Sequence, residues 1–149
     1  MPLARQTLDV LRRSVPDEPV QGPALSWGDA RLSNLIYRNF EVVAVLDWEM
    51  VSLADPLLDV GWWLFADAAL TQGMGADRLP GFPSAAETGR RWSTLTGRSA
   101  DALAYYELLG GLRFTIIMLR MGKLLHGMGL VPDTFPHDNL ISQALEQRV

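Results

Sequence analysis

The chain of 149 residues contains no cysteine and a single lysine, Lys123. Without cysteine, disulfide bonds, thiolate catalysis and cysteine-ligated zinc are excluded. The 13 lysine and arginine residues are scattered, and the 17 acidic residues outnumber them, so the formal net charge is −4. Proteins that bind nucleic acids through the phosphate backbone need a basic patch. We therefore predict no nucleic-acid partner.

A membrane-spanning run and a signal peptide are also missing. The longest mainly apolar stretch, residues 102–125, is interrupted by four charged residues, which favours a buried helix over a membrane span. The first ten residues, "MPLARQTLDV", lack the apolar segment of a signal peptide. We therefore expect a soluble protein without a membrane partner, and the absence of cysteine fits a cytoplasmic location.

The remaining composition is that of one folded domain. Hydrophobic residues make up 48% of the chain, which is enough to bury a core. The sequence shows no internal repeat and no low-complexity segment. We predict a single domain over residues 1–149.

Most of the chain shows a helical pattern. Residues 3–14 place Leu3, Leu8 and Leu11 near one face, and Pro16 and Pro19 follow them. Further helices are predicted over residues 55–70, 83–97, 100–126 and 136–146. Asp55 is the expected cap of the helix over 55–70, and Ser84 with Glu87 forms a capping-box pattern. The pair Gly110-Gly111 is a possible kink in the helix over 100–126.

Two segments rich in β-branched and aromatic residues lie before these helices. "NLIYR" (34–38) and "EVVAVLDW" (41–48) are separated only by Asn39 and Phe40. Two strands joined by two residues form a β-hairpin. Another short strand is predicted over residues 23–27. The predicted fold class is therefore mainly α with a small β-hairpin.

Polar residues stand at the two ends of this hairpin. Asp29 and Asn34 lie on the loop that enters the first strand, and Asp47 follows the second strand. Antiparallel pairing brings these ends to the same neighbourhood. Carboxylate and amide oxygens are the ligands that Mg²⁺ prefers. We predict that Asn34 and Asp47 share a metal site beside Asp29.

The amino-acid sequence of this region resembles that of a known family. "GDARLSNLIY" (28–37) followed by "VVAVLDWEMVSLADPLLDVGWW" (42–63) is similar to the aminoglycoside phosphotransferase family, whose superfamily of small-molecule kinases includes choline kinases. The resemblance covers residues 23–66 closely and the helical remainder loosely. It implies a protein-kinase-like fold, Mg²⁺ and ATP as cofactors, and transfer of the γ-phosphate to a hydroxyl group of a small molecule.

The resemblance also implies a role for several residues. Asp29 would be the catalytic base, while Asn34 and Asp47 would hold Mg²⁺ against the nucleotide phosphates. Asp59 resembles the buried acid that binds the backbone N–H groups of the catalytic loop. Trp27 stands where the family usually has histidine, which predicts altered support of the loop.

Other polar and aromatic residues are given structural roles. Arg31 is expected to pair with a nearby acid rather than with a phosphate, and the tryptophans outside this loop are expected in the core (Trp48, Trp62, Trp63 and Trp92). Scattered acids could form a rim for a cationic substrate, although such acids usually form an ordinary solvated surface (Asp67, Asp77, Glu87 and Asp101).

Two parts of a phosphotransferase are not found in these residues. No glycine-rich loop lies between two strands, and no lysine is placed to pair with nucleotide phosphates. The chain is therefore expected to be the C-terminal lobe of the kinase-like fold, with the N-terminal nucleotide-binding lobe absent. Two functions stay open: a small-molecule kinase that is inactive as this chain alone, and a non-catalytic remnant that binds a ligand or partner. Apolar surface near Trp27, Leu46 and Trp48 is expected to be uncovered, which favours a homodimer.

Overall fold

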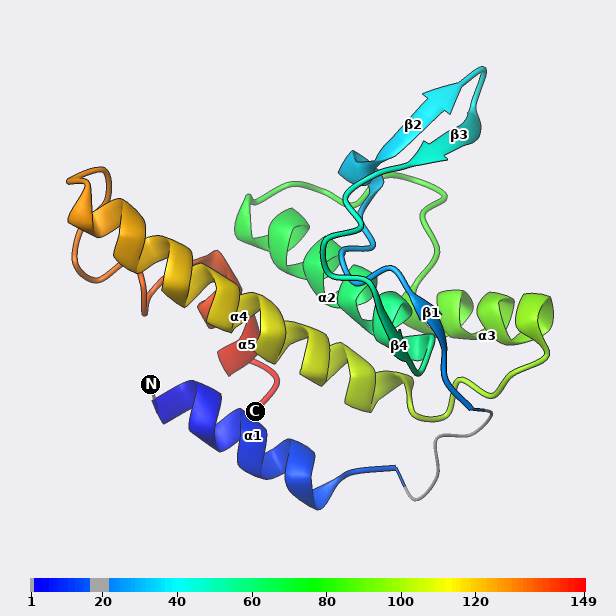
Figure 1. Ribbon diagram of the computed structural model, residues 1–149, viewed down its shortest axis with the longest axis horizontal. Coiled ribbons are helices and arrows are strands. Elements are labelled where there is room, and N and C mark those ends of the chain that lie inside the picture. The colour runs from blue at the N-terminus through cyan, green and yellow to red at the C-terminus, as the bar shows by residue number, and fades with distance from the viewer. Residues whose placement is uncertain (1, 17–21) are drawn as a thin grey trace.

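The computed structural model describes residues 2–16 and 22–149 and shows a helix-rich arrangement with a small β part (Figure 1). The prediction of a mainly helical fold with a β-hairpin is confirmed. Pro19, expected to help end the first helix, lies outside the described residues. The elements are α1 (Pro2–Arg13), β1 (Ala24–Ser26), the 3₁₀ helix η1 (Leu32–Asn34), β2 (Leu35–Arg38), β3 (Glu41–Val45), β4 (Ser52–Ala54), α2 (Leu57–Gly73), α3 (Ala85–Thr96), α4 (Leu103–Gly127) and α5 (Leu140–Glu146).

The core lies where α2, α4 and α5 pack together (Figure 1). Its buried residues come from these three helices: Trp62, Phe65, Ala66, Ala69, Phe114, Ile141, Ala144 and Leu145. α1 packs against α4. None of the helices in residues 2–16 and 22–149 is long and apolar enough to cross a bilayer.

Glycines set how closely α2 and α4 approach each other. A Cβ atom on Gly61 would lie 2.3 Å from the carbonyl carbon of Tyr106, and one on Gly110 would lie 2.9 Å from the Cα of Trp62. Side chains at these positions would push the two helices apart. At Gly110 and Gly111, the predicted weak point of this helix, α4 continues without interruption. Their role is close packing.

The buried face of α1 differs from the predicted one. Thr7 and Leu11 are buried, while Leu8 is 38% exposed. Positions 3, 7 and 11 follow the four-residue spacing of one helix face, and Leu8 lies about 100° around the axis from Thr7. The Thr7 hydroxyl donates to the Leu3 carbonyl at 2.8 Å, so a threonine is tolerated there.

The predicted capping box of α3 is present, whereas the residue at the N-cap of α2 is Pro56 rather than Asp55. The Oδ1 of Asp55 accepts a hydrogen bond from the Leu57 N–H at 2.9 Å, although α2 itself begins at Leu57. At α3, Ser84 and Glu87 form a complete capping box, and Gly97 ends the helix with a left-handed φ of 70°. These short-range contacts satisfy N–H groups that have no partner inside the helix.

The last helix is shorter than predicted. α5 begins at Leu140 rather than near Pro136. The side chain of Asn139 accepts hydrogen bonds from the N–H groups of Ile141 and Ser142, each at 3.1 Å. Asn139 has an extended backbone, so this cap fixes the start of the helix.

The β part consists of two antiparallel pairs. The hairpin of β2 and β3 turns at Asn39 and Phe40, whose φ angles of 51° and 66° are both left-handed, as a type I′ turn requires. Figure 1 shows this hairpin projecting from the helical body. β1 pairs with β4, a strand that the sequence did not predict. This second pair holds the two ends of residues 24–54 together.

Candidate functional site

The loop that follows β1 is held by the carboxylate of Asp59, in the first turn of α2. Its Oδ1 accepts hydrogen bonds from the Ser26 hydroxyl (2.8 Å) and the Gly28 N–H (2.7 Å). Its Oδ2 accepts one from the Trp27 N–H at 2.7 Å. Hydrogen bonds to an ionised group are short and strong. These are the backbone contacts that the resemblance implies for Asp59.

Gly28 lets the chain turn sharply before Asp29. Its φ is 94°, and a Cβ atom there would lie only 2.4 Å from the carbonyl oxygen of Met50. Both the left-handed backbone and the close approach of Met50 require glycine. The segment before β4 is thereby packed against the loop.

The Asp29 carboxylate is buried, with 6% of the residue exposed, and both of its oxygens are hydrogen-bonded. Oδ2 accepts from the Arg31 guanidinium at 2.5 Å and from the Asn34 amide at 2.8 Å. Oδ1 accepts from the indole N–H of Trp62 at 3.1 Å. The expectation that Arg31 pairs with a nearby acid is confirmed.

Asn34 and the segment of Asp47 lie side by side across the start of the hairpin. The Asn34 carbonyl accepts a hydrogen bond from the Leu46 N–H at 2.8 Å. Asp47 follows directly, is exposed, and has a left-handed φ of 61°. The Trp27 indole N–H donates to the carbonyls of Leu46 (2.8 Å) and Asp47 (3.1 Å). Trp27 therefore links the Asp29 loop to the Asp47 segment.

These groups do not form a closed metal site. Among the residues that the structure describes, no three His, Cys, Asp or Glu side chains gather closely enough to hold a metal ion. Asn34 and Asp47 are two oxygen donors at most, and Mg²⁺ commonly takes one or two protein ligands together with phosphate and water.

Comparison with known proteins connects this geometry to a family. Residues 2–92, more than half of the chain, match the phosphotransferase enzyme family. The chain belongs to this family. The matched region contains Asp29, Asn34, Asp47 and Asp59, the residues on which the resemblance was based. The resemblance to the aminoglycoside phosphotransferases is thereby confirmed.

A solved structure and curated proteins are similar to this chain. The crystal structure of a "putative aminoglycoside phosphotransferase" from Ralstonia eutropha JMP134 covers 99% of the chain with a TM-score of 0.75 and 25% identity, and the match spans 49% of that structure. Acyl-CoA dehydrogenase family member 11 of Pongo abelii is 28% identical over 126 residues, which are 74% of this chain and 16% of the relative. Acyl-CoA dehydrogenase family member 10 of Mus musculus is 50% identical over 44 residues, which are 28% of this chain and 4% of the relative. The chain thus spans only a small part of the curated relatives.

The tryptophans of the chain differ in burial. Trp62 is 3% exposed and belongs to the core, as predicted, while Trp63 and Trp92 are half-buried. The prediction for Trp48 was wrong, because this residue is 42% exposed. It follows β3 of the projecting hairpin. Its indole lies 6.0 Å from that of Trp27 and donates to the Val45 carbonyl.

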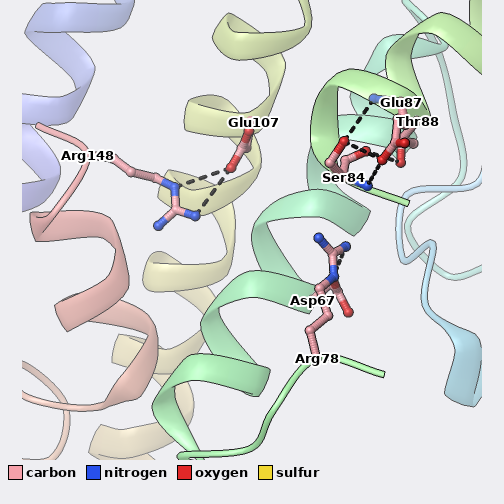
Figure 2. Close-up of polar contacts among 7 residues, drawn as sticks. All are labelled: Asp67, Arg78, Ser84, Glu87, Thr88, Glu107 and Arg148. Atoms are coloured by element: carbon pink, nitrogen blue, oxygen red, sulfur yellow. Dashed lines mark hydrogen bonds and ion pairs between the residues drawn. The ribbon is translucent and has the colours of Figure 1, made fainter. Parts of the chain in front are cut away.

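Two of the acids considered for a substrate rim have partners on the surface (Figure 2). Asp67 pairs with Arg78 at 2.8 Å. The Glu87 carboxylate accepts hydrogen bonds from the hydroxyl and N–H of Ser84, and the hydroxyl contact in particular lowers the pKa of Glu87. These contacts account for both acids as local structure, and they give no sign of a site for a cationic substrate.

Arg113 is part of the site although no role was predicted for it. It lies on α4, and its guanidinium carbon is 5.5 Å from the centroid of the Trp62 ring. Burial lowers the pKa of Arg113, while the negative charges of Asp59 and Asp29 oppose this effect. One feature of the sequence could have indicated a role for Arg113: it is a charged residue within the mainly apolar stretch 102–125.

Tyr106, on α4, should make the stability of the chain sensitive to alkaline pH. Burial, together with the negative charge of Asp55, raises the pKa of Tyr106 to about 12, whereas an unfolded tyrosine ionises near pH ~10. Between these values the unfolded chain loses a proton that the folded chain keeps. The contribution of the protonated Tyr106 to the free energy of unfolding is therefore complete below pH ~10 and is lost as the pH rises towards about 12.

The matched test compares Tyr106→Phe with Tyr105→Phe by near-ultraviolet absorbance titration. The chain has three tyrosines. We expect the wild type and Tyr105→Phe to show one tyrosine that ionises late, and Tyr106→Phe to lose this step. A late step that persists in Tyr106→Phe would assign it to another residue.

Proposed function

We propose that this chain is the substrate-side lobe of an enzyme that transfers the γ-phosphate of ATP to a hydroxyl group of a small molecule. The observation that carries the proposal is the Asp29 carboxylate. It is buried, it is held by donors on both oxygens, and it lies on one loop with Asn34. A carboxylate fixed in this way suits a general base, whose oxygen must meet the acceptor hydroxyl at hydrogen-bond distance.

In this proposal Asp29 receives the proton of the acceptor hydroxyl through Oδ2. Arg31 and Asn34 both donate to this oxygen. The Arg31 side chain is 34% exposed and has room to turn away, while Asn34 keeps its bond. Trp62 keeps its hydrogen bond to Oδ1, so the carboxylate need not rotate. The hydroxyl oxygen then attacks the γ-phosphorus while its proton moves to Asp29, and the bond from the γ-phosphorus to the bridging oxygen of ATP breaks, so that ADP leaves.

The oxygen donors beside Asp29 fit Mg²⁺. Because the amide nitrogen of Asn34 donates to Asp29, the amide oxygen is left for a cation. The exposed Asp47 supplies a carboxylate. Bound together with nucleotide phosphates, the ion would neutralise the charge that develops during transfer. Asn34 and Asp47 would hold it.

The nucleotide itself needs residues that these 149 do not supply. Phosphotransferases use a glycine-rich loop and a lysine on the phosphates, and the only lysine, Lys123, lies on α4. We therefore propose that residues 1–149 alone do not transfer phosphate. Joined to an N-terminal nucleotide-binding lobe of the same family, hereafter the completed enzyme, they should transfer phosphate from ATP to a hydroxyl substrate.

Magnesium binding by the chain alone should be weak. Asn34 and Asp47 provide too few ligands without nucleotide phosphates. Calorimetric titration of residues 1–149 with Mg²⁺ should show no saturable binding, and Asp47→Asn should give the same trace. Submicromolar affinity that disappears in Asp47→Asn would contradict this account, because it would mean that the chain holds a complete metal site.

The alternative function is a non-catalytic module that binds a ligand or partner. The observation that favours it is the contact between Arg31 and Asp29, which occupies the oxygen a base would use. If this pair never opens, Asp29 is structural. The completed enzyme separates the two functions, since only the first predicts transfer of phosphate.

We also propose that the projecting hairpin associates with a second copy of the chain. It exposes large apolar side chains on a two-stranded sheet whose outer edges have no partner within the described residues: Ile36, Tyr37, Phe40, Val42, Val43 and Leu46. Monomeric proteins rarely expose contiguous apolar surface of this kind, and free strand edges pair readily.

Sedimentation of residues 1–149 should therefore show a concentration-dependent dimer. Leu46→Lys should shift the chain towards the monomer, because it places a charge in the apolar surface. Leu95→Lys is the matched control, because Leu95 is also exposed but lies on α3. The Leu95→Lys variant should still form the dimer. A monomeric wild type at high concentration would refute the proposal.

A further inference from the structure

The Asp29 carboxylate is held by a residue of α2 as well as by residues of its own loop. Trp62, on α2, is 3% exposed, and its indole N–H donates to Oδ1 at 3.1 Å. An indole nitrogen donates and never accepts a hydrogen bond. The contact therefore suits a carboxylate oxygen and favours one orientation of the Asp29 side chain.

Trp62 is in turn fixed by two neighbouring residues of α4. The Phe114 ring stacks on it, with centroids 5.2 Å apart and planes at 27°. The Arg113 guanidinium carbon lies 5.5 Å from the indole centroid, within the range of a cation–π contact. Phe114 supplies packing, whereas Arg113 adds a positive charge next to an indole that donates to an anion.

Packing alone does not explain the presence of Arg113. Its Nη1 atom is buried and has no hydrogen-bond partner among the described residues, and an unsatisfied buried donor is costly. An apolar side chain would cover Trp62 without this cost. Gly61 and Gly110 bring α2 and α4 into close contact beside this position.

We infer that Trp62 and Arg113 are positioning residues for Asp29, with Trp62 orienting the carboxylate through Oδ1 and Arg113 holding the indole in place. Oδ1 then accepts from Trp62, while Oδ2, which accepts from Arg31 and Asn34, is the oxygen that meets the acceptor hydroxyl once Arg31 turns away. The arrangement gives the base one productive oxygen. The use of Asp29 as a base rests on the proposed function, but the two contacts can be tested without it.

The first test is nuclear magnetic resonance of residues 1–149 with labelled tryptophan. The chain has five indole N–H groups, and the signal lost in Trp62→Phe identifies that of Trp62. In Arg113→Met we expect hydrogen exchange of this group to accelerate by about tenfold or more, with an upfield shift of its proton. In Arg113→Lys, which keeps the positive charge, the exchange rate and the chemical shift of the Trp62 indole proton should stay close to the wild-type values.

The controls separate this effect from general loosening. Arg120 is exposed on the same helix, so Arg120→Met should leave the Trp62 signal unchanged. The other four indole signals should keep their positions in every variant. If Arg113→Met does not fold, Asp29→Asn still tests the contact, since it changes the acceptor of Trp62 and should move the same signal. A Trp62 signal that stays unchanged in Arg113→Met or in Asp29→Asn overturns the inference.

The second test uses the completed enzyme and compares Trp62→Phe with Trp92→Phe. In Trp62→Phe the Asp29 carboxylate loses its fixed orientation, which should lower kcat by about tenfold or more and leave KM for ATP unchanged. Trp92→Phe, on α3, should behave as wild type. Full activity in Trp62→Phe overturns the positioning role. An inactive wild type together with the expected resonance changes would instead contradict the proposed function and leave the contacts established.

Discussion

Replacing Asp59 by asparagine should lower the free energy of unfolding by about 2–4 kcal/mol. The carboxylate accepts hydrogen bonds from Ser26, Trp27 and Gly28. An amide has one oxygen, and its NH₂ group would face a donor. At least one N–H or O–H group of the loop would then lose its partner, and the remaining bonds would lose the assistance of the charge.

Asp67→Asn is the matched control for this prediction. Asp67 lies on the same helix and pairs with Arg78, whose side chain is 41% exposed, so breaking this pair should cost at most about 1 kcal/mol. Chemical denaturation of residues 1–149 measures both values. An Asp59→Asn variant as stable as Asp67→Asn would show that Asp59 does not hold the loop.

In the completed enzyme, Asp29→Asn should lower kcat by roughly 10²-fold or more. An amide is not a base at neutral pH, although its oxygen can still accept the hydrogen bond from Trp62. The NH₂ group takes the place of Oδ2 beside the donors Arg31 and Asn34, so the proton of the acceptor hydroxyl has no group to accept it. KM for ATP should change little, because Asp29 meets the acceptor rather than the nucleotide.

Steady-state kinetics against a panel of hydroxyl substrates checks this prediction. Asp67→Asn again serves as the control and should retain wild-type kcat. Full activity in Asp29→Asn would remove the assignment of Asp29 as the base. A completed enzyme that binds its ligands but transfers nothing would favour the non-catalytic module.

Local signals explain which parts of the fold could be predicted from the sequence. The two-residue turn at Asn39 and Phe40 and the capping box at Ser84 depend on neighbours in the chain, and the structure contains both. β4 could not be predicted, because three residues carry no clear alternation and its partner, β1, lies far along the chain. Pairing between distant segments has no local signature.

The same distinction applies to the candidate site. Asp29 and Asn34 stand five positions apart on one loop, so the sequence alone suggested that they lie together. The contact of Asp29 with Trp62 depends on how α2 packs beneath the loop, and Trp48 has a similarly apolar neighbourhood in sequence yet is exposed. Arg113 reaches Trp62 only through close helix packing. Sequence patterns do not record such tertiary contacts.

The most direct test of the account is transfer of labelled γ-phosphate from ATP to a hydroxyl substrate. The account predicts a labelled phosphate ester with the completed enzyme, none with residues 1–149 alone, and at most about one-hundredth of the wild-type rate with Asp29→Asn. Undiminished ester formation by Asp29→Asn, or no ester from a completed enzyme that binds both ATP and substrate, would contradict it.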